Sequence, residues 1–232
     1  MARRIAIIED DKDLRENYSD TFRKQGYQVI SFDNRPDAQK ALQTRLPDLA
    51  LIDIGLGDEI DGGFALCQWL RQQSKTLPII FLSARDSDFD IVSGLRMGAD
   101  DYLTKDISLP HLMARVAALF RRMEVMEEAK EIPEELILRG KLKIDGQRFL
   151  CSWEEVNIEL TLTEFWMVHA LAKHIGHVKN RDQLMHESKI LVDDATITSH
   201  IKRIRKKFIE IDSNFDCIET VYGMGYRWTS QK

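Results

Sequence analysis

The chain has 232 residues, the length of one large domain or of two ordinary ones. Hydrophobic residues make up 44% of it and charged residues 31%, a globular balance that excludes collagen-like and wholly disordered chains. The formal net charge of -5 argues, taken alone, against a protein that binds nucleic acid.

Cysteine usage and hydropathy predict a soluble, cytoplasmic protein. The 3 cysteines lie far apart without CxxC spacing, which fits reduced thiols better than disulfides or a zinc site. The first apolar run, Ile5–Ile8, is too short for a signal peptide and ends at acidic residues. No apolar run approaches the 18 or so residues needed to span a membrane, so we expect no membrane segment.

Residues 1–123 alternate short apolar runs with amphipathic stretches. Continuous apolar runs are typical of strands buried on both faces of a parallel sheet. Here they comprise residues 5–8, 27–30, 49–52, 79–82 and 101–103. The clearest amphipathic stretch follows Ser108 and carries an apolar stripe to Met123. Five strands alternating with five helices predict a doubly wound α/β domain with a five-stranded parallel sheet.

Residues 124–135 differ from both flanks. They hold six glutamates, one lysine and Pro133, with little apolar content. This composition predicts an acidic linker between two domains. The alternative is that the preceding helix continues for one or two turns.

Residues 136–232 predict a separate α+β domain. The pattern Thr161-x-x-Glu164 forms a capping box before a helix that ends at Gly176. A short helix and a longer one that begins after Asp194 come next, and a hairpin that turns at residues 223–225 closes the chain. Strand-like segments precede them at residues 136–138, 142–144, 148–151 and 156–160.

Polar residues follow four of the strands predicted in the first domain. Glu9 and Asp10 follow the first strand, Asp53 the third, Ser83 the fourth and Lys105 the fifth. The carboxyl ends of parallel strands meet in one crevice, where carboxylate oxygens suit Mg²⁺. Asp53 can then act as a nucleophile toward a phosphoryl group, with Ser83 and Lys105 on its oxygens. Each residue alone could be a helix cap or a solvated loop residue, but the whole set predicts a functional site.

The segments that carry this set resemble the receiver domain of response regulators. They are Ile7–Asp11, Leu51–Asp53, Phe81–Arg85 and Gly98–Lys105. The resemblance implies a phosphoryl group supplied by a sensor histidine kinase. It further implies that Asp53 is the phosphoacceptor, that Glu9, Asp10, Asp53 and the Gly55 carbonyl hold Mg²⁺, that Ser83 and Tyr102 are the switch pair, and that Lys105 binds phosphate.

Two features depart from the family pattern. The loop Gly55–Phe64 is about two residues longer than usual, glycine-rich and acidic, and Lys105 precedes Asp106 where the family has a cis-proline. A cis bond before a non-proline residue costs roughly 2.5–4 kcal/mol, so this peptide is either cis or trans. These features resemble a subgroup associated with a proteobacterial dedicated sortase system. They also motivate an alternative, a DNA binder with an atypical receiver that does not depend on phosphorylation.

The stretch Ala195–Ile209 holds five basic residues and no acidic one. At 100° per residue an isoleucine stripe faces one way, and Ser199, Lys202, Arg203 and Lys206 face the other. That is the layout of a helix docked into the major groove of double-stranded DNA, although a solvated basic face is the ordinary alternative.

This half resembles the winged-helix effector domain of the OmpR/PhoB class. The resemblance rests on Leu160–Phe165, Arg181–Leu184, His200–Lys207 and Thr220–Arg227. It implies a contact with RNA polymerase at residues 188–193. Tyr222 stands where an arginine is usual, which favours weaker binding to the DNA backbone. The implied DNA contacts are Thr196, Ser199, His200, Lys202, Arg203 and Arg205 in the major groove and Arg227 in a minor groove.

The same class forms a homodimer when phosphorylated, through its fourth helix, fifth strand and fifth helix. Ile91 and His111 replace a lysine–glutamate pair of the family, which predicts a less ionic and pH-sensitive contact. The positions that form intermolecular salt bridges in relatives correspond to Asp100, Asp101, Arg115 and Arg122.

The sequence therefore favours a phosphorylation-controlled transcription regulator, not an enzyme beyond its own phosphorylation and dephosphorylation. An aspartyl-phosphate enzyme would need a second catalytic acid beside Asp53, and a flavodoxin-like carrier would need a glycine loop after the first strand. The acidic net charge does not contradict DNA binding, because the linker alone contributes -5 while residues 136–232 hold 15 basic and 13 acidic residues.

Overall fold

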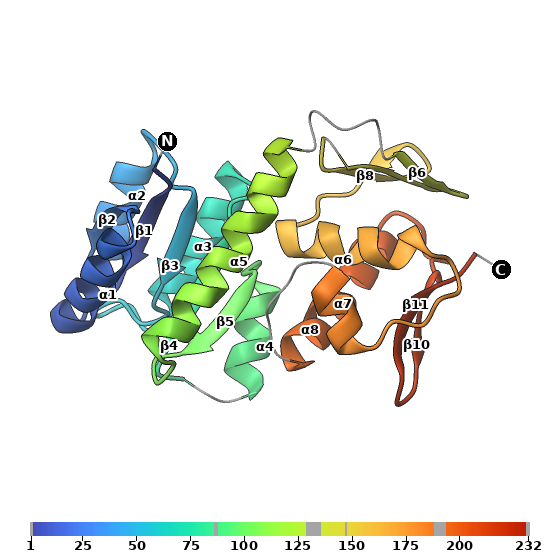
Figure 1. Ribbon diagram of the computed structural model, residues 1–232. Helices are drawn as coiled ribbons and strands as arrows, with labels where there is room; N and C mark the ends of the chain where they lie inside the picture. The colour runs from blue at the N-terminus through green and yellow to red at the C-terminus, as the bar shows by residue number, and fades with distance from the viewer. Residues whose placement is uncertain (1, 86–87, 129–135, 147, 188–193, 231–232) are drawn as a thin grey trace. The chain divides into compact units, whose positions relative to one another are not determined.

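The computed structural model describes residues 2–85, 88–128, 136–146, 148–187 and 194–230. The chain forms two compact units, Met1–Ala114 and Arg115–Lys232 (Figure 1). Among the described residues, no helix is both long enough and apolar enough to cross a membrane.

Strands and helices alternate along the first half of the chain, as the sequence predicts. The five strands form one parallel sheet in the order β2-β1-β3-β4-β5, so the doubly wound prediction is confirmed. The elements are β1 (Arg4–Ile8), α1 (Lys12–Lys24), β2 (Gln28–Phe32), α2 (Arg35–Leu42), β3 (Leu49–Ile52), α3 (Gly62–Gln73), β4 (Ile79–Ser83), α4 (Asp88–Arg96), β5 (Asp101–Thr104) and α5 (Leu109–Glu128).

The central strands β1, β3 and β4 are apolar except at Arg4 and Ser83, because both faces of the sheet are covered. Ile8, Ile52 and Phe81 pack into one core with residues of α2, α3 and α4. Their strand neighbours Ile7 and Leu51 point to the opposite face and are equally buried. The sheet therefore leaves only its strand ends free for chemistry.

Helix α5 extends beyond residue 123, the predicted end of the first domain. It continues to Glu128, so the first five residues of the acidic segment are helical, and residues 129–135 lie outside the described part of the chain. The helical alternative thus holds for residues 124–128.

The second half has the predicted winged-helix architecture. A four-stranded antiparallel sheet, β6-β7-β8-β9, precedes three helices and a two-stranded hairpin. The strand expected at residues 156–160 is shorter than predicted and covers only Val156–Asn157. The elements are β6 (Leu136–Arg139), β7 (Leu142–Asp145), β8 (Leu150–Trp153), β9 (Val156–Asn157), α6 (Leu162–Lys173), α7 (Arg181–Glu187), α8 (Asp194–Ile209), β10 (Ile218–Val221) and β11 (Gly225–Trp228).

An aromatic cluster joins the helices of this unit to both of its sheets. The rings of Phe208 and Phe215 stack with centroids 4.4 Å apart, and Trp153 lies 5.6 Å from Phe208. Trp228 on the hairpin completes the cluster. Because Phe208 belongs to α8, the cluster fixes which side of that helix faces inward.

Candidate functional sites

The carboxyl ends of the parallel strands form the first candidate site. The strand order reverses between β1 and β3, the position at which ligands bind in such sheets. Asp53 directly follows β3, and its N–H donates to the carbonyl of Ile8 on β1 at 2.8 Å. A side chain at Gly63 would lie 2.0 Å from the Asp53 carbonyl, so only glycine lets α3 begin this close to the site.

Lys105 brings two of the predicted carboxylates together. Its Nζ donates to Glu9 Oε1 and to Asp53 Oδ2, each at 2.7 Å. The Lys105 N–H also donates to the carbonyl of Ser83 at 2.9 Å, which ties the end of β5 to the end of β4. Among the described residues no peptide bond is cis, so the Lys105–Asp106 peptide is trans. Lys105 thus reaches the predicted position without a cis-proline after it.

Burial and charge shift the ionisation of this cluster. Burial raises the pKa of Glu9 to about 7, against the opposing hydrogen bond from Lys105. Burial also raises the pKa of Asp53, and Lys105 again opposes it. For Lys105 itself, burial lowers the pKa, but the hydrogen bonds to Asp53 and Glu9 outweigh this and leave it raised. The lysine therefore favours the ionised form of both carboxylates.

The same cluster fits a divalent cation. Oxygens of Glu9, Asp10 and Asp53 lie within 4.8 Å of one another, and Asp10 is exposed to solvent. Three carboxylates, once ionised, and one ammonium leave two negative charges, and hard oxygen donors with an open side suit hydrated Mg²⁺. Gly55 begins the loop that follows Asp53. A bound ion would supply positive charge for a phosphoryl group and would keep Glu9 and Asp53 ionised.

The predicted switch residues are both buried: Ser83 ends β4, and Tyr102 is the second residue of the neighbouring strand β5. Arg85 connects them, because its N–H donates to Ser83 Oγ at 3.1 Å and its carbonyl accepts from the Tyr102 hydroxyl at 2.8 Å. A side chain at Gly94 would lie 2.7 Å from the Tyr102 ring, so this glycine leaves room for the inward tyrosine.

Two of the expected dimer residues are buried within the unit. Asp100 accepts from Arg71 Nη2 at 2.7 Å and from the Ile79 N–H at 3.1 Å, an intramolecular arrangement that the sequence does not suggest. Asp101 is also buried, and its Oδ1 accepts from the Tyr102 N–H. Arg115 is half-buried, and the Arg122 side chain lies outside the described part of the structure. The resemblance implies an intermolecular salt bridge for Asp100, but here Asp100 is buried and pairs with Arg71 of the same chain.

The basic helix α8 forms the second candidate site, and its exposed face is narrower than expected. Thr196 and His200 are fully buried, because they lie on the side that packs against the domain. Lys202 and Lys206 are exposed, and Ser199 is half-buried. The expectation that Thr196 and His200 meet DNA is therefore corrected in this structure.

Glu164 explains why two basic residues of α8 turn inward. This buried carboxylate, on the first turn of α6, forms ion pairs with Arg203 and Lys207, the latter at 2.6 Å. Its other contact is with the Thr161 N–H in the predicted capping box, which the structure confirms. Arg203 is consequently also removed from the expected DNA contacts. The sequence shows the capping glutamate but not its partners, which come from a helix about forty residues away.

The hairpin β10–β11 is attached to α8. Arg205 donates to the Ile218 carbonyl at 2.8 Å and to Thr220 Oγ1 at 2.8 Å. Arg227, expected in a minor groove, forms an ion pair with Glu219 at 2.8 Å across the hairpin. At the turn, Tyr222 is 94% exposed. The hairpin is therefore held to α8 by Arg205 and carries an exposed aromatic residue at its turn.

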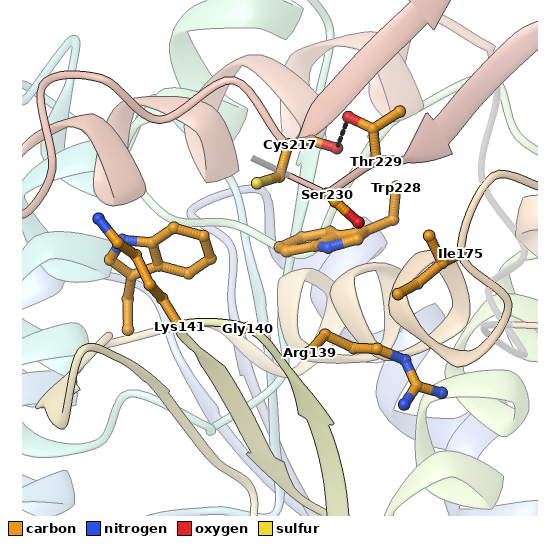
Figure 2. Close-up of a pocket in the computed structure, with 9 residues that line it drawn as sticks. Arg139, Gly140, Lys141, Ile175, Cys217, Trp228, Thr229 and Ser230 are labelled. Atoms are coloured by element: carbon orange, nitrogen blue, oxygen red, sulfur yellow. Dashed lines mark hydrogen bonds between the residues drawn. The ribbon is translucent and has the colours of Figure 1, made fainter. Parts of the chain in front are cut away.

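A cavity of about 190 Å³ lies elsewhere in the second unit (Figure 2). Thr229 Oγ1 donates to the Cys217 carbonyl on one wall, and on the other Arg139 Nε donates to the Ala172 carbonyl at 3.1 Å. Because these polar groups already have partners in the protein, we assign the cavity no ligand. Its lining comprises Arg139, Gly140, Lys141, Trp153, Ile175, Cys217, Trp228, Thr229 and Ser230.

Comparison with known proteins finds matches for both halves of the chain. The family model of the response regulator receiver domain matches residues 5–117, and that of the C-terminal domain of transcriptional regulatory proteins matches residues 154–228. The alkaline phosphatase synthesis transcriptional regulatory protein PhoP of Bacillus subtilis is 33% identical over 239 residues, covering 100% of this chain and 99% of its own. The phosphate regulon transcriptional regulatory protein PhoB of Escherichia coli is 33% identical over 236 residues and 100% of both chains.

Comparison with solved structures also finds matches over nearly the whole chain. The response regulator DrrB, an OmpR/PhoB homologue from Thermotoga maritima, aligns with a TM-score of 0.53 and 28% identity over 99% of this chain and 100% of its own. A mutant of RitR aligns over 99% of this chain and 100% of its own with a TM-score of 0.77 and 23% identity, which shows likeness of fold alone.

Proposed function

The chain belongs to the OmpR/PhoB class of two-component response regulators, and we propose that Asp53 is the residue that carries its phosphoryl group. As a member of this class it is a phosphorylation-controlled transcription regulator with a histidine kinase as partner, and it is not a conventional enzyme. The observation that supports Asp53 is its hydrogen bond to Lys105 in a crevice shared with Glu9 and Asp10.

The chemistry proposed for this site is transfer of a phosphoryl group to a carboxylate. An oxygen of Asp53 attacks phosphorus while the P–N bond of the kinase's phosphohistidine breaks, and the imidazole leaves with that electron pair. Lys105 favours the ionised Asp53 before attack and can then contact a phosphoryl oxygen. Ser83, at the end of the neighbouring strand β4, would donate its hydroxyl to another phosphoryl oxygen, while Glu9, Asp10, Asp53 and the Gly55 carbonyl would hold Mg²⁺.

Phosphorylation from a small donor tests this assignment. Incubation of the full chain with acetyl phosphate and Mg²⁺ should add the mass of one phosphoryl group, and Asp53→Asn should abolish the gain. The chain would then catalyse its own phosphorylation, and hydrolysis would reverse it. A wild-type chain that gains no mass with any donor, yet binds DNA, would favour the alternative of a receiver that works without phosphate.

The DNA interface that we propose combines α8 with the hairpin. Lys202 and Lys206 are the exposed charges suited to phosphates, and the proposed interface further includes Ser199, Arg205 and Arg227. The domains proposed are a receiver at 1–123, a linker at 124–135 and a winged helix at 136–232. The phosphorylated chain would dimerise, and RNA polymerase would contact residues 188–193, which lie outside the described structure. The loop after Asp53 also supports membership of the sortase-associated subgroup.

A further inference from the structure

The long acidic loop that follows Asp53 has a defined conformation at the edge of the crevice. Leu56 and Glu59 exchange backbone hydrogen bonds of 3.0 and 3.2 Å, so residues 56–59 form a tight turn. Gly57 occupies the turn with a φ of 63°, which favours glycine. We call residues 56–61 the crevice loop.

The crevice loop contacts a proposed metal ligand directly. The Gly57 N–H donates to Asp10 Oδ2 at 3.1 Å. Asp10 is the exposed carboxylate of the cluster, so without a contact of this kind its side chain is free to rotate away from Glu9 and Asp53. The hydrogen bond orients Asp10 toward the cluster before a cation arrives.

Arg35, at the start of α2, holds the crevice loop from outside. Its Nε donates to Glu59 Oε2 at 2.6 Å and its Nη2 to Glu59 Oε1 at 2.9 Å. Two parallel hydrogen bonds of this kind fix the relative orientation of both groups. Gln39 Oε1 also accepts from Arg35 Nη1 at 3.0 Å and keeps the guanidinium in place.

A second arginine holds the far end of the same loop. Arg85 Nη2 donates to the Ile60 carbonyl at 2.7 Å, and Arg85 Nη1 to Asp61 Oδ1 at 3.1 Å. A side chain at Gly62 would lie 2.8 Å from Glu59 Oε2, so this glycine leaves the space that the Glu59 carboxylate needs. Arg35 and Arg85 therefore hold the crevice loop in place, and the loop presents the Gly57 N–H to Asp10.

We propose that Arg35 and Glu59 are positioning residues for Mg²⁺, acting through the Gly57 N–H on Asp10. The proposal rests on the metal site proposed above. It gives the unusual length and charge of the loop a role: Glu59 provides the carboxylate by which α2 fixes the turn. Neither residue touches the cation in this scheme.

A Mg²⁺ titration of the full chain, followed by the NMR shifts of backbone amides, tests the proposal. Arg35→Ala and Glu59→Gln should each weaken Mg²⁺ binding by about tenfold, since changes behind a metal ligand commonly cost 10- to 100-fold. The double variant should bind Mg²⁺ no more weakly than either single variant, because each of the three variants breaks the same Arg35–Glu59 pair. The Gly57 amide proton should exchange faster with solvent in each variant, a change that loss of stability elsewhere would not produce selectively.

Arg23→Ala is the matched control, because Arg23 forms an exposed ion pair with Asp20 on α1. It should leave Mg²⁺ affinity unchanged. Affinities within twofold of the wild type for both Arg35→Ala and Glu59→Gln would overturn the proposal while the metal site stands. A wild-type chain that shows no Mg²⁺-dependent shifts would overturn the metal site and this proposal together. If Arg35→Ala fails to fold, Glu59→Gln alone decides the outcome.

Discussion

Glu164 is a fully buried carboxylate whose charge is balanced by two cations from another helix. Burial would raise the pKa of Glu164, but Arg203 and Lys207 outweigh it and hold the pKa at about 2. A carboxyl group with a lowered pKa stabilises the fold above its ordinary pKa near 4.5 and loses that contribution as the pH falls toward 2. The ion pairs of Glu164 therefore stabilise the second unit at neutral pH, and this stabilisation is lost in acid.

We expect Glu164→Gln to destabilise the second unit by about 3–5 kcal/mol at pH 7, because it leaves two partly buried cations without their buried carboxylate. The wild type should lose about 3 kcal/mol of this advantage between pH 4.5 and 2, whereas the variant should not. Urea unfolding of the full chain, followed by tryptophan fluorescence, measures both effects. Glu210→Gln, at an exposed i,i+4 pair, is the control. Equal stability of wild type and Glu164→Gln at pH 7 would contradict the role of the pair.

At the level of elements, α8 divides its basic residues between two tasks. Arg203 and Lys207 connect it to Glu164, and Arg205 connects it to the hairpin. Lys202 and Lys206 remain on the exposed side. One side of the helix thus packs within the domain, and the other is its proposed DNA-binding surface.

This division predicts different outcomes for neighbouring substitutions. Lys202→Ala and Lys206→Ala should each reduce the slope of log affinity against log salt by about 0.9, the value for one lost phosphate contact. Arg203→Ala should instead lower the melting temperature. Fluorescence anisotropy on duplexes selected from a random pool, between 50 and 200 mM salt or so, measures the slopes. Lys12→Ala in the first unit is the control. An unchanged slope for both lysine variants would argue against this surface.

For the whole molecule, phosphorylation at one site must change DNA binding at another. Dimerisation through the proposed receiver, residues 1–123, would couple the two, since two linked DNA-binding domains raise each other's effective concentration on DNA. Two arginines of α5 are proposed for this contact. Arg115 is half-buried, and the side chain of Arg122 lies outside the described part of the structure.

Arg115→Ala should prevent the dimer that forms on phosphorylation, because it removes a cation from the proposed interface. Size-exclusion chromatography with light scattering, before and after treatment with acetyl phosphate and Mg²⁺, gives the mass directly. Lys24→Ala on α1 should dimerise as the wild type does. A phosphorylated Arg115→Ala chain that still dimerises normally would exclude Arg115 from the contact.

Sequence alone determined the features that depend on short-range pattern. Continuous apolar runs predicted the buried parallel strands, and Thr161 with Glu164 predicted the cap of α6. Strand ends also predicted the group Glu9, Asp53 and Lys105, because in a parallel sheet those ends converge by topology.

Only the tertiary structure decided which charges are available to partners. Arg203 and Asp100 look like surface residues in the sequence, yet each pairs with a residue distant along the chain, Glu164 and Arg71. The same holds for Arg35, which reaches the crevice loop through Glu59. Periodicity assigns a residue to a face of its own helix, but the pairing of charges depends on which elements pack together, and no local pattern contains that information.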